Sequence, residues 1–147
     1  MAWGCSLLGD AALSEKIGQI CSVLAQNVRE KAFREGSLRN ECERGKEDER
    51  RIWWVQAEAV VGFLRAGYRR EAEDILAFIE DKIVDKRPGS EWLSGVAPLR
   101  TSGTGYDSED VPRPLSWEIS PDPVVEEWKC PYHNGRMCLE ILRRDCI

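Results

Sequence analysis

The stretch WKCPYHNGRMC, residues 128–138, contains the only histidine in the sequence, His133. Tryptophan, cysteine, asparagine and arginine surround it, so proton transfer, metal binding and a structural role are all open. A helix is predicted over residues 135–145 with Asn134 as its N-cap. The positive end of that helix, together with Arg136, favours the neutral imidazole. His133 is therefore a candidate general base.

Metal binding is a second interpretation of the same stretch. A zinc site would use Cys130, His133, Cys138 and Cys146. Cys130 and His133 have a spacing that suits a ligand pair, but the second half lacks the paired ligands of a zinc finger. A cysteine nucleophile paired with His133 has no recognisable surrounding motif. A surface or hydrogen-bonded structural histidine is the ordinary alternative to all of these.

A tryptophan and a carboxylate lie on one face of another predicted helix. Trp54 and Glu58 are four residues apart, so their side chains project one above the other. Trp53 is turned from them by about 100° and belongs with the apolar face. An indole beside a carboxylate suits a sugar, whose C–H face packs on the ring while its hydroxyl groups donate to the carboxylate. The alternative is two core tryptophans and a solvated glutamate.

Helical spacing of apolar residues predicts the elements that position these groups. The predicted helices cover residues 14–35, 52–67, 70–85 and 135–145. The second and third are joined closely enough for an antiparallel αα-hairpin. Residues 37–50 are polar and are predicted to form an exposed connection. Residues 89–127 are rich in Pro, Gly, Ser and Thr and are predicted to form a long irregular loop.

The pattern of elements decides the predicted fold class. No sustained run of alternating strands is evident, so we predict an all-α fold in one domain over residues 1–147. Helical hairpins bury their apolar faces by stacking on further hairpins, and three and a half helices make an incomplete stack. We therefore expect a piece of something larger, with unpaired apolar faces that favour poor solubility or self-association.

Composition and charge narrow the classes of function. Hydrophobic residues make up 42% of the chain and charged residues 32%, as in an ordinary soluble protein. The formal net charge of -5 argues against general attraction to nucleic acid or to membranes. The start, MAWGCSLLGDAALSEK, is unlike a signal peptide, so we expect a cytoplasmic protein. Its six cysteines are then expected to be free thiols.

Two longer segments resemble a known family. RIWWVQAEAVVGFL (residues 51–64) and WKCPYHNGRMCLEILRR (residues 128–144), with FIEDKIVDK and GSEW between them, closely resemble the C-terminal third of cellobiose 2-epimerases. These isomerases belong to the N-acylglucosamine 2-epimerase superfamily. The resemblance implies part of an (α/α)6 toroid whose inner helices line a sugar-binding cleft. It also implies inversion at C2 of the reducing-end glucose of a β-1,4-linked disaccharide, such as cellobiose or lactose, without a metal or organic cofactor.

The resemblance implies roles for individual residues. His133 matches one member of a histidine acid/base pair that removes the C2 proton to form a cis-enediolate and returns a proton to the opposite face. Trp128 matches a tryptophan that packs against the substrate. Trp54 and Glu58 match residues that line the sugar site. The positive charge of Arg136, close to His133 in the sequence, adds a further candidate, expected to stabilise the negative charge of the enediolate.

One departure from the family bears on catalysis. The family's other active-site histidines lie upstream of the matched region and include the second acid/base member, in a motif like GHDIE. They have no counterpart in this sequence, whose only histidine is His133. Two interpretations are open. The chain is a piece of an epimerase that works with the missing N-terminal portion of the barrel, or it is a catalytically silent module that binds sugar or acts as a scaffold.

Overall fold

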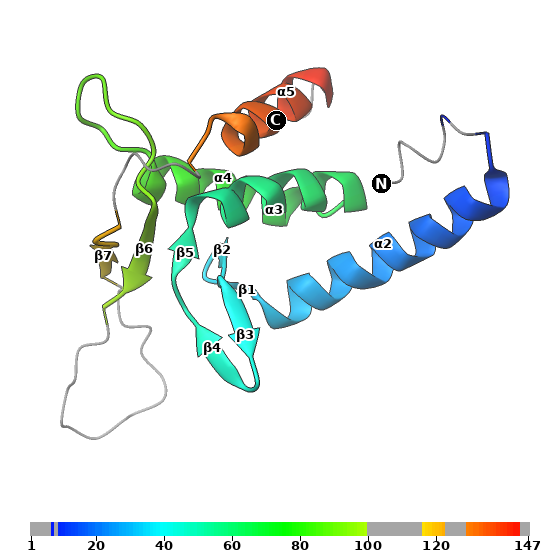
Figure 1. The fold of residues 1–147 in the computed structure, drawn as a ribbon, viewed down its shortest axis with the longest axis horizontal. Coiled ribbons are helices and arrows are strands. Elements are labelled where there is room, and N and C mark those ends of the chain that lie inside the picture. Colours follow the sequence, from blue (N-terminus) through cyan, green and yellow to red (C-terminus); the bar gives the residue numbers. More distant parts are fainter. Residues whose placement is uncertain (1–6, 8, 100–115, 123–128, 145–147) are drawn as a thin grey trace.

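Helices dominate the part of the chain that the computed structural model describes, which is residues 7, 9–99, 116–122 and 129–144. They are α2 (Ala11–Lys31), α3 (Trp53–Ala66), α4 (Arg69–Phe78) with its π-helical continuation η1 (Ile79–Ile83), and α5 (Tyr132–Arg144). In Figure 1, α3 and α4 lie at the centre, α5 lies above them and α2 extends away. The predicted helices are all confirmed, with bounds that differ by a few residues.

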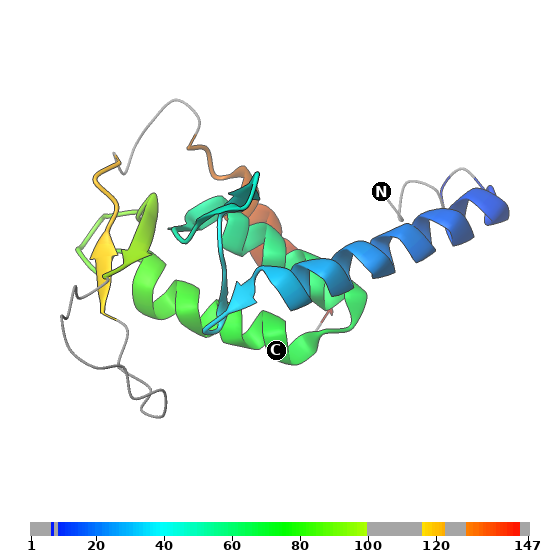
Figure 2. The same ribbon diagram turned by 90° about the horizontal axis from the view of Figure 1, so that it is seen from below.

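α3 and α4 form the predicted hairpin and hold most of the core. Gly67 ends α3 in a left-handed conformation, with a φ of 83° that glycine adopts without strain. The buried side chains of the two helices are Trp53, Gln56, Ala57, Ala59, Val60, Val61 and Phe63 from α3, and Ala72, Ile75 and Phe78 from α4. Figures 1 and 2 show the two helices next to each other in perpendicular views. The first turn of α3 therefore belongs to a helix that the core holds in place.

Short antiparallel strands accompany the helices, so the all-α prediction is wrong in this respect. They are β1 (Phe33–Arg34) with β2 (Ser37–Leu38), β3 (Glu41–Glu43) with β4 (Lys46–Asp48), and β5 (Arg51–Ile52) with β6 (Gly95–Pro98) and β7 (Trp117–Ile119). Each strand is too short to show a period of two. The β3–β4 hairpin is almost fully exposed, so no apolar face marked it in the sequence.

The segment predicted as an irregular loop over residues 89–127 contains two of these strands. Val96 of β6 lies opposite Ile119 of β7, and the other edge of β6 pairs with β5, which directly precedes α3. A Cβ atom on Gly95 would lie 3.0 Å from the carbonyl oxygen of Arg51, so this close approach of two strands suits a glycine. Residues 100–115 and 123–128 lie outside the described residues.

Two buried polar side chains connect α3 and the strand before it to β2. The side-chain amide of Gln56 accepts from the Leu38 N–H at 2.9 Å and donates to the Leu38 carbonyl at 2.8 Å. Arg51, which is 1% exposed, donates from Nε to Ser37 Oγ at 2.8 Å and pairs with Glu35 at 3.1 Å. Because each group finds a partner, its burial is tolerated. These contacts fix the strand that leads into α3.

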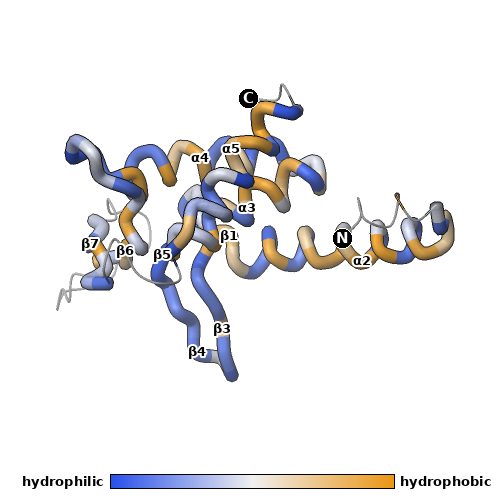
Figure 3. The backbone as a smooth tube through the Cα atoms, turned by 45° about the horizontal axis from the view of Figure 1, so that its top comes forward, coloured by the Kyte–Doolittle hydropathy of each residue, from blue (hydrophilic) through white to orange (hydrophobic). Residues whose placement is uncertain are grey.

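α2 leaves a long apolar face uncovered. None of its residues is buried, and Ile20, Val23 and Leu24 are 48%, 58% and 54% exposed. Near its C-terminal end, Arg29 pairs with Glu71 of α4. Figure 3 shows apolar positions recurring along α2 where it runs away from the other elements. The unpaired face expected from the sequence is present, whereas poor solubility stays a prediction. No helix among the described residues is long and apolar enough to cross a membrane.

Candidate active site

Glu58 of α3 contacts two residues of α5. Its Oε1 atom lies 2.9 Å from Nδ1 of His133, and its Oε2 atom accepts a hydrogen bond from Nη1 of Arg136. The three side chains are each about one third exposed, so solvent or a ligand can reach the group. Three residues that were singled out separately in the sequence are therefore brought together by the packing of α5 on α3.

The charge of Glu58 sets the arrangement of protons in this group. Burial raises the pKa of Glu58, but hydrogen bonds from Arg136 and His133 outweigh burial, and the pKa is lowered below its ordinary value. Glu58 is thus a carboxylate near neutral pH and can only accept hydrogen bonds. Nδ1 of His133 must then carry the proton that it shares with Glu58. In the neutral imidazole, Nε2 is left unprotonated and can accept a proton.

Aromatic rings surround the imidazole. The ring centroid of His133 lies 5.7 Å from those of Trp53 and Trp54 and 5.1 Å from that of Tyr132. Trp53 is buried, whereas Trp54 is 43% and Tyr132 60% exposed. The sequence prediction that Trp53 faces the core and Trp54 does not is confirmed, which excludes the alternative of two core tryptophans. Tyr132 was not predicted, although its place directly before His133 was a signal.

The start of α5 differs from the prediction. The helix begins at Tyr132 rather than after Asn134, and the carbonyl of Pro131 accepts from the Gly135 N–H at 3.0 Å. Asn134 therefore lies inside the first turn, where its side chain accepts from the N–H of Gly135 at 2.9 Å. Proline before a first turn is favourable because its fixed φ suits helix entry. His133 lies within the first turn and still sits near the positive end of the helix.

Further contacts hold α5 in place on α3. Met137 is buried in the core, with Ile141 packed against it one turn later. Glu140 forms an ion pair with Arg65 near the other end of α3. The polar contacts and the apolar contacts thus lie along neighbouring lines of α5, and together they set the register in which His133 meets Glu58.

The structure bears on the zinc interpretation but not on the prediction that Trp128 packs against a sugar. Trp128 lies outside the described residues, so its predicted contact with a substrate stays a prediction. Cys130 and Cys138 are exposed free thiols, and among the described residues no three His, Cys, Asp or Glu side chains form a group that could hold a metal ion. Cys146, the fourth ligand in the zinc interpretation, also lies outside that part of the chain.

An apolar groove runs beside the candidate site. It lies between α2 and α3 and has a volume of about 640 Å³. Leu24 and Val28 of α2 line one wall, and Trp54 and Glu58 of α3 contribute to the other. The stripe of α3 predicted to meet a sugar is thus shared between this groove and the contact with α5.

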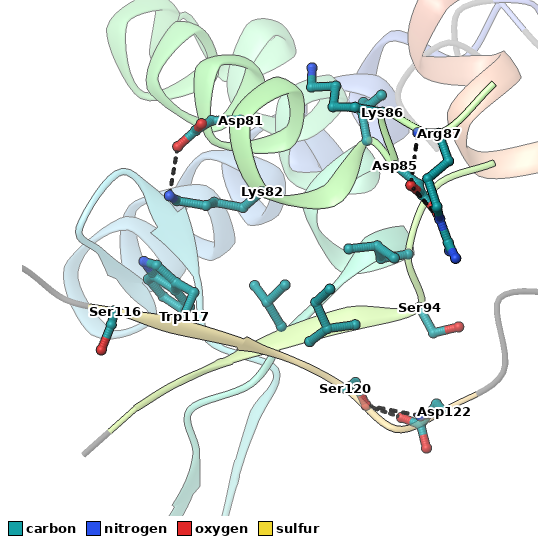
Figure 4. Close-up of a pocket in the computed structure, with 14 residues that line it drawn as sticks. Asp81, Lys82, Asp85, Lys86, Arg87, Ser94, Ser116, Trp117, Ser120 and Asp122 are labelled. Atoms are coloured by element: carbon teal, nitrogen blue, oxygen red, sulfur yellow. Dashed lines mark hydrogen bonds and ion pairs between the residues drawn. The ribbon is translucent and has the colours of Figure 1, made fainter. Parts of the chain in front are cut away.

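A second cavity lies between η1 and the three-stranded sheet. It has a volume of about 750 Å³. Figure 4 shows Asp81 and Lys82 of η1 on one side of it and Trp117 of β7 on the other. Many of its charged groups are already paired: Lys82 lies 2.9 Å from Asp81, and Arg87 binds Asp85. None of the residues predicted to be functional lines this cavity. The candidate site is therefore the group around His133.

Comparison with known proteins adds a family to this geometry. No family model matches the sequence. A cellobiose 2-epimerase from Eubacterium cellulosolvens is 45% identical over 97% of this chain, which is 33% of that protein. The crystal structure of a sugar epimerase from a ruminal bacterium has a TM-score of 0.75 and 34% identity, covering 98% of this chain and 35% of that one. The chain is a homologue of the cellobiose 2-epimerases.

The likeness to cellobiose 2-epimerases extends to a second solved structure and covers part of each relative. The structure of a cellobiose 2-epimerase from Bacillus thermoamylovorans B4167 has a TM-score of 0.63 and 33% identity, covering 86% of this chain and 30% of that one. The chain spans about a third of the length of the relatives it matches. The resemblance inferred from two sequence segments is confirmed, and the family is one of isomerases.

Proposed function

We propose that the chain is part of a sugar epimerase that inverts C2 of the reducing-end glucose of β-1,4-linked disaccharides such as cellobiose or lactose. The observation that carries the proposal is the contact of Glu58 with both His133 and Arg136, in a chain homologous to cellobiose 2-epimerases. Because the carboxylate holds the Nδ1 proton, Nε2 of the neutral imidazole is the base.

The proposed reaction takes a proton from one face of C2 and adds a proton to the other. After the sugar ring opens, Nε2 of His133 removes the C2 proton, and the electron pair of the C–H bond moves towards the carbonyl to give a cis-enediolate. Rotation about C2–C3 then presents the opposite face to a second acid. The guanidinium of Arg136, held by Glu58, favours the negative charge on the enediolate oxygens. The exposed indole of Trp54 offers a surface for the sugar C–H groups.

The second acid must come from outside this sequence if it is a histidine, because His133 is the only one here. We place the chain in an (α/α)6 toroid that an N-terminal portion completes. Two observations support this: the chain spans 33% of a relative that is 45% identical, and α2 leaves apolar residues such as Leu24 exposed beside an open groove. Further helices would cover that groove and close the sugar site.

A chimaera tests the proposal. This chain would replace the matching third of the cellobiose 2-epimerase from Eubacterium cellulosolvens, and conversion of lactose to epilactose would be measured by chromatography. We expect turnover in the chimaera, and loss of turnover when His133→Gln is introduced. A folded chimaera that binds cellobiose but converts none, or a His133→Gln variant with full activity, would contradict the proposal.

A silent sugar-binding or scaffold module is the second candidate, and the single histidine is the observation that favours it. Titration of the unmodified chain with cellobiose, followed by tryptophan fluorescence, separates the candidates when combined with the chimaera. Binding without turnover in either form supports the silent module. The absence of any fluorescence change at millimolar sugar would count against both sugar-based functions, because Trp54 is exposed beside His133.

A further inference from the structure

Lys129 is a buried lysine four residues before His133. Its side chain is 3% exposed, which is unusual because a buried ammonium needs partners to replace water. Nζ donates a hydrogen bond to the carbonyl oxygen of Trp92, lies 3.9 Å from Oε2 of Glu91, and sits 5.7 Å from the ring centroid of Trp53. The ammonium thus meets a carbonyl, a carboxylate and an aromatic face at once.

The partners of Lys129 named above come from two separate elements. Trp92 lies in the segment that follows η1. An isolated antiparallel β-bridge between Trp92 and Val84 holds this segment. Trp53 is the first residue of α3, and its indole also packs against the imidazole of His133, edge to face at 74°. Lys129 therefore contacts the same indole that packs against the imidazole, and it anchors the segment from which α5 begins.

We propose that Lys129 is a positioning residue for His133. Its ammonium ties the residues that lead into α5 to the Trp92 carbonyl and to the ring of Trp53, and this keeps the imidazole within hydrogen-bonding distance of Glu58. The catalytic meaning of this role rests on the proposed function of His133, whereas the placement of the imidazole does not.

The chemistry of Lys129 supports positioning over simple stabilisation. Burying a single charge costs desolvation, which its partners offset only in part. A methionine at position 129 would fill the same space without a buried charge, but it would leave the Trp92 carbonyl without this donor. Only the ammonium gives a directed hydrogen bond to Trp92 together with an attraction to the Trp53 face. Lys129 thus costs desolvation energy but supplies directed contacts, which suits a residue that fixes the position of its neighbours.

The single histidine makes a direct test possible, because every imidazole signal in a nuclear magnetic resonance spectrum of the chain belongs to His133. The fraction of neutral imidazole with its proton on Nδ1 would be measured from the ring ¹⁵N shifts. We expect a high fraction in the unmodified chain and a fall of about twofold or more in Lys129→Met, since the hydrogen bond to Glu58 is no longer held. Lys86→Met, the same change at an exposed lysine, is the matched control and leaves the fraction unchanged.

Each outcome decides the proposal. A folded Lys129→Met chain with an unchanged Nδ1–H fraction overturns it. If Lys129→Met does not fold, Lys129→Gln takes its place, because its polar side chain is shorter and lacks the charge that attracts the Trp53 face. A fraction equal to that of the unmodified chain again overturns the proposal. The measurement needs no turnover. An inactive chimaera with the expected tautomer change would therefore contradict the proposed epimerase and leave the positioning role of Lys129 standing.

Discussion

Nδ1 of His133 lies 2.9 Å from Oε1 of Glu58, although 75 residues separate them in the sequence. The same carboxylate binds Arg136 through its other oxygen. The fold uses one acidic residue of α3 to orient two residues of α5. The contact predicts how substitutions on either helix will behave.

Glu58→Gln tests the orienting carboxylate. In the chimaera we expect kcat to fall by about 100-fold, because a neutral amide no longer fixes the Nδ1–H form of His133 or balances the charge of Arg136. Steady-state kinetics with lactose would measure this. Glu73→Gln, at an exposed glutamate of α4 that pairs with Arg69, is the control and keeps full activity. Equal kcat values for the two variants would contradict the role of Glu58.

Trp54→Ala tests the exposed indole beside His133. We expect KM for the disaccharide to rise roughly fivefold with a smaller change in kcat, because in the proposed site the indole packs on the sugar face and such a contact is worth about 1 kcal/mol. Trp54→Phe, which keeps a smaller ring, should give an intermediate KM. A Trp54→Ala variant with unchanged KM and unchanged binding of cellobiose would show that the indole does not touch the sugar.

Gln56→Leu tests the fastening of α3 to the strand before it. We expect a loss of about 2–4 kcal/mol in the free energy of unfolding, because the buried N–H and carbonyl of Leu38 would both lose their partner. Urea denaturation followed by circular dichroism measures this. Gln26→Leu, at an exposed glutamine of α2 that bonds to Glu30, should change stability by less than about 0.5 kcal/mol. A stable Gln56→Leu chain would contradict the importance of this contact.

Acid should weaken the fold by protonating paired carboxylates. The pKa of Glu58 is lowered in the folded chain, and hydrogen bonds from Arg50 and Arg87 lower those of Asp48 and Asp85. A group with a lowered folded pKa stabilises the fold above its unfolded pKa, and that stability is lost as pH falls through the folded pKa. Urea midpoints should therefore decrease as the pH falls below about 4.

The Glu58 part of this acid effect can be isolated. Glu58→Gln removes the stabilising charge at every pH, so its urea midpoint should be lower than that of the unmodified chain near pH 7 and should approach it below about pH 4. A difference between the two chains that stays constant, or grows as the pH falls, would contradict a stabilising ion pair of Glu58 with Arg136 that is lost in acid.

Local patterns predicted part of this structure. The helical periods located α3 and α4, and spacing by four residues correctly placed Trp54 and Glu58 on one face apart from Trp53. The predicted N-cap at Asn134 is wrong because Pro131 starts the helix earlier, and its carbonyl accepts from the Gly135 N–H within the first turn. No local pattern marks the short strands, whose pairing depends on residues distant in the chain.

The contacts between helices could not be predicted from spacing. Nothing in the sequence around His133 specifies which face of α3 it meets, because the register depends on Met137 packing into the core and on Glu140 reaching Arg65. The resemblance to a family gave Glu58 a place in the sugar site, but not its hydrogen bond to His133. Lys129 was missed because its burial is a tertiary property with no local signal.

The long separation between Glu58 and His133 also bears on the order of folding. Joining α5 to α3 closes a loop of 75 residues, whereas α3 and α4 meet through the short turn at Gly67. Closing the longer loop costs more chain entropy, so the hairpin should form first and the imidazole should reach its carboxylate late. In reverse, the same order predicts that α5 detaches from α3 in local unfolding before the α3–α4 hairpin opens. Amide hydrogens of α5 should then exchange with solvent faster than those of α3, and a ligand that bridges the two helices would slow that exchange.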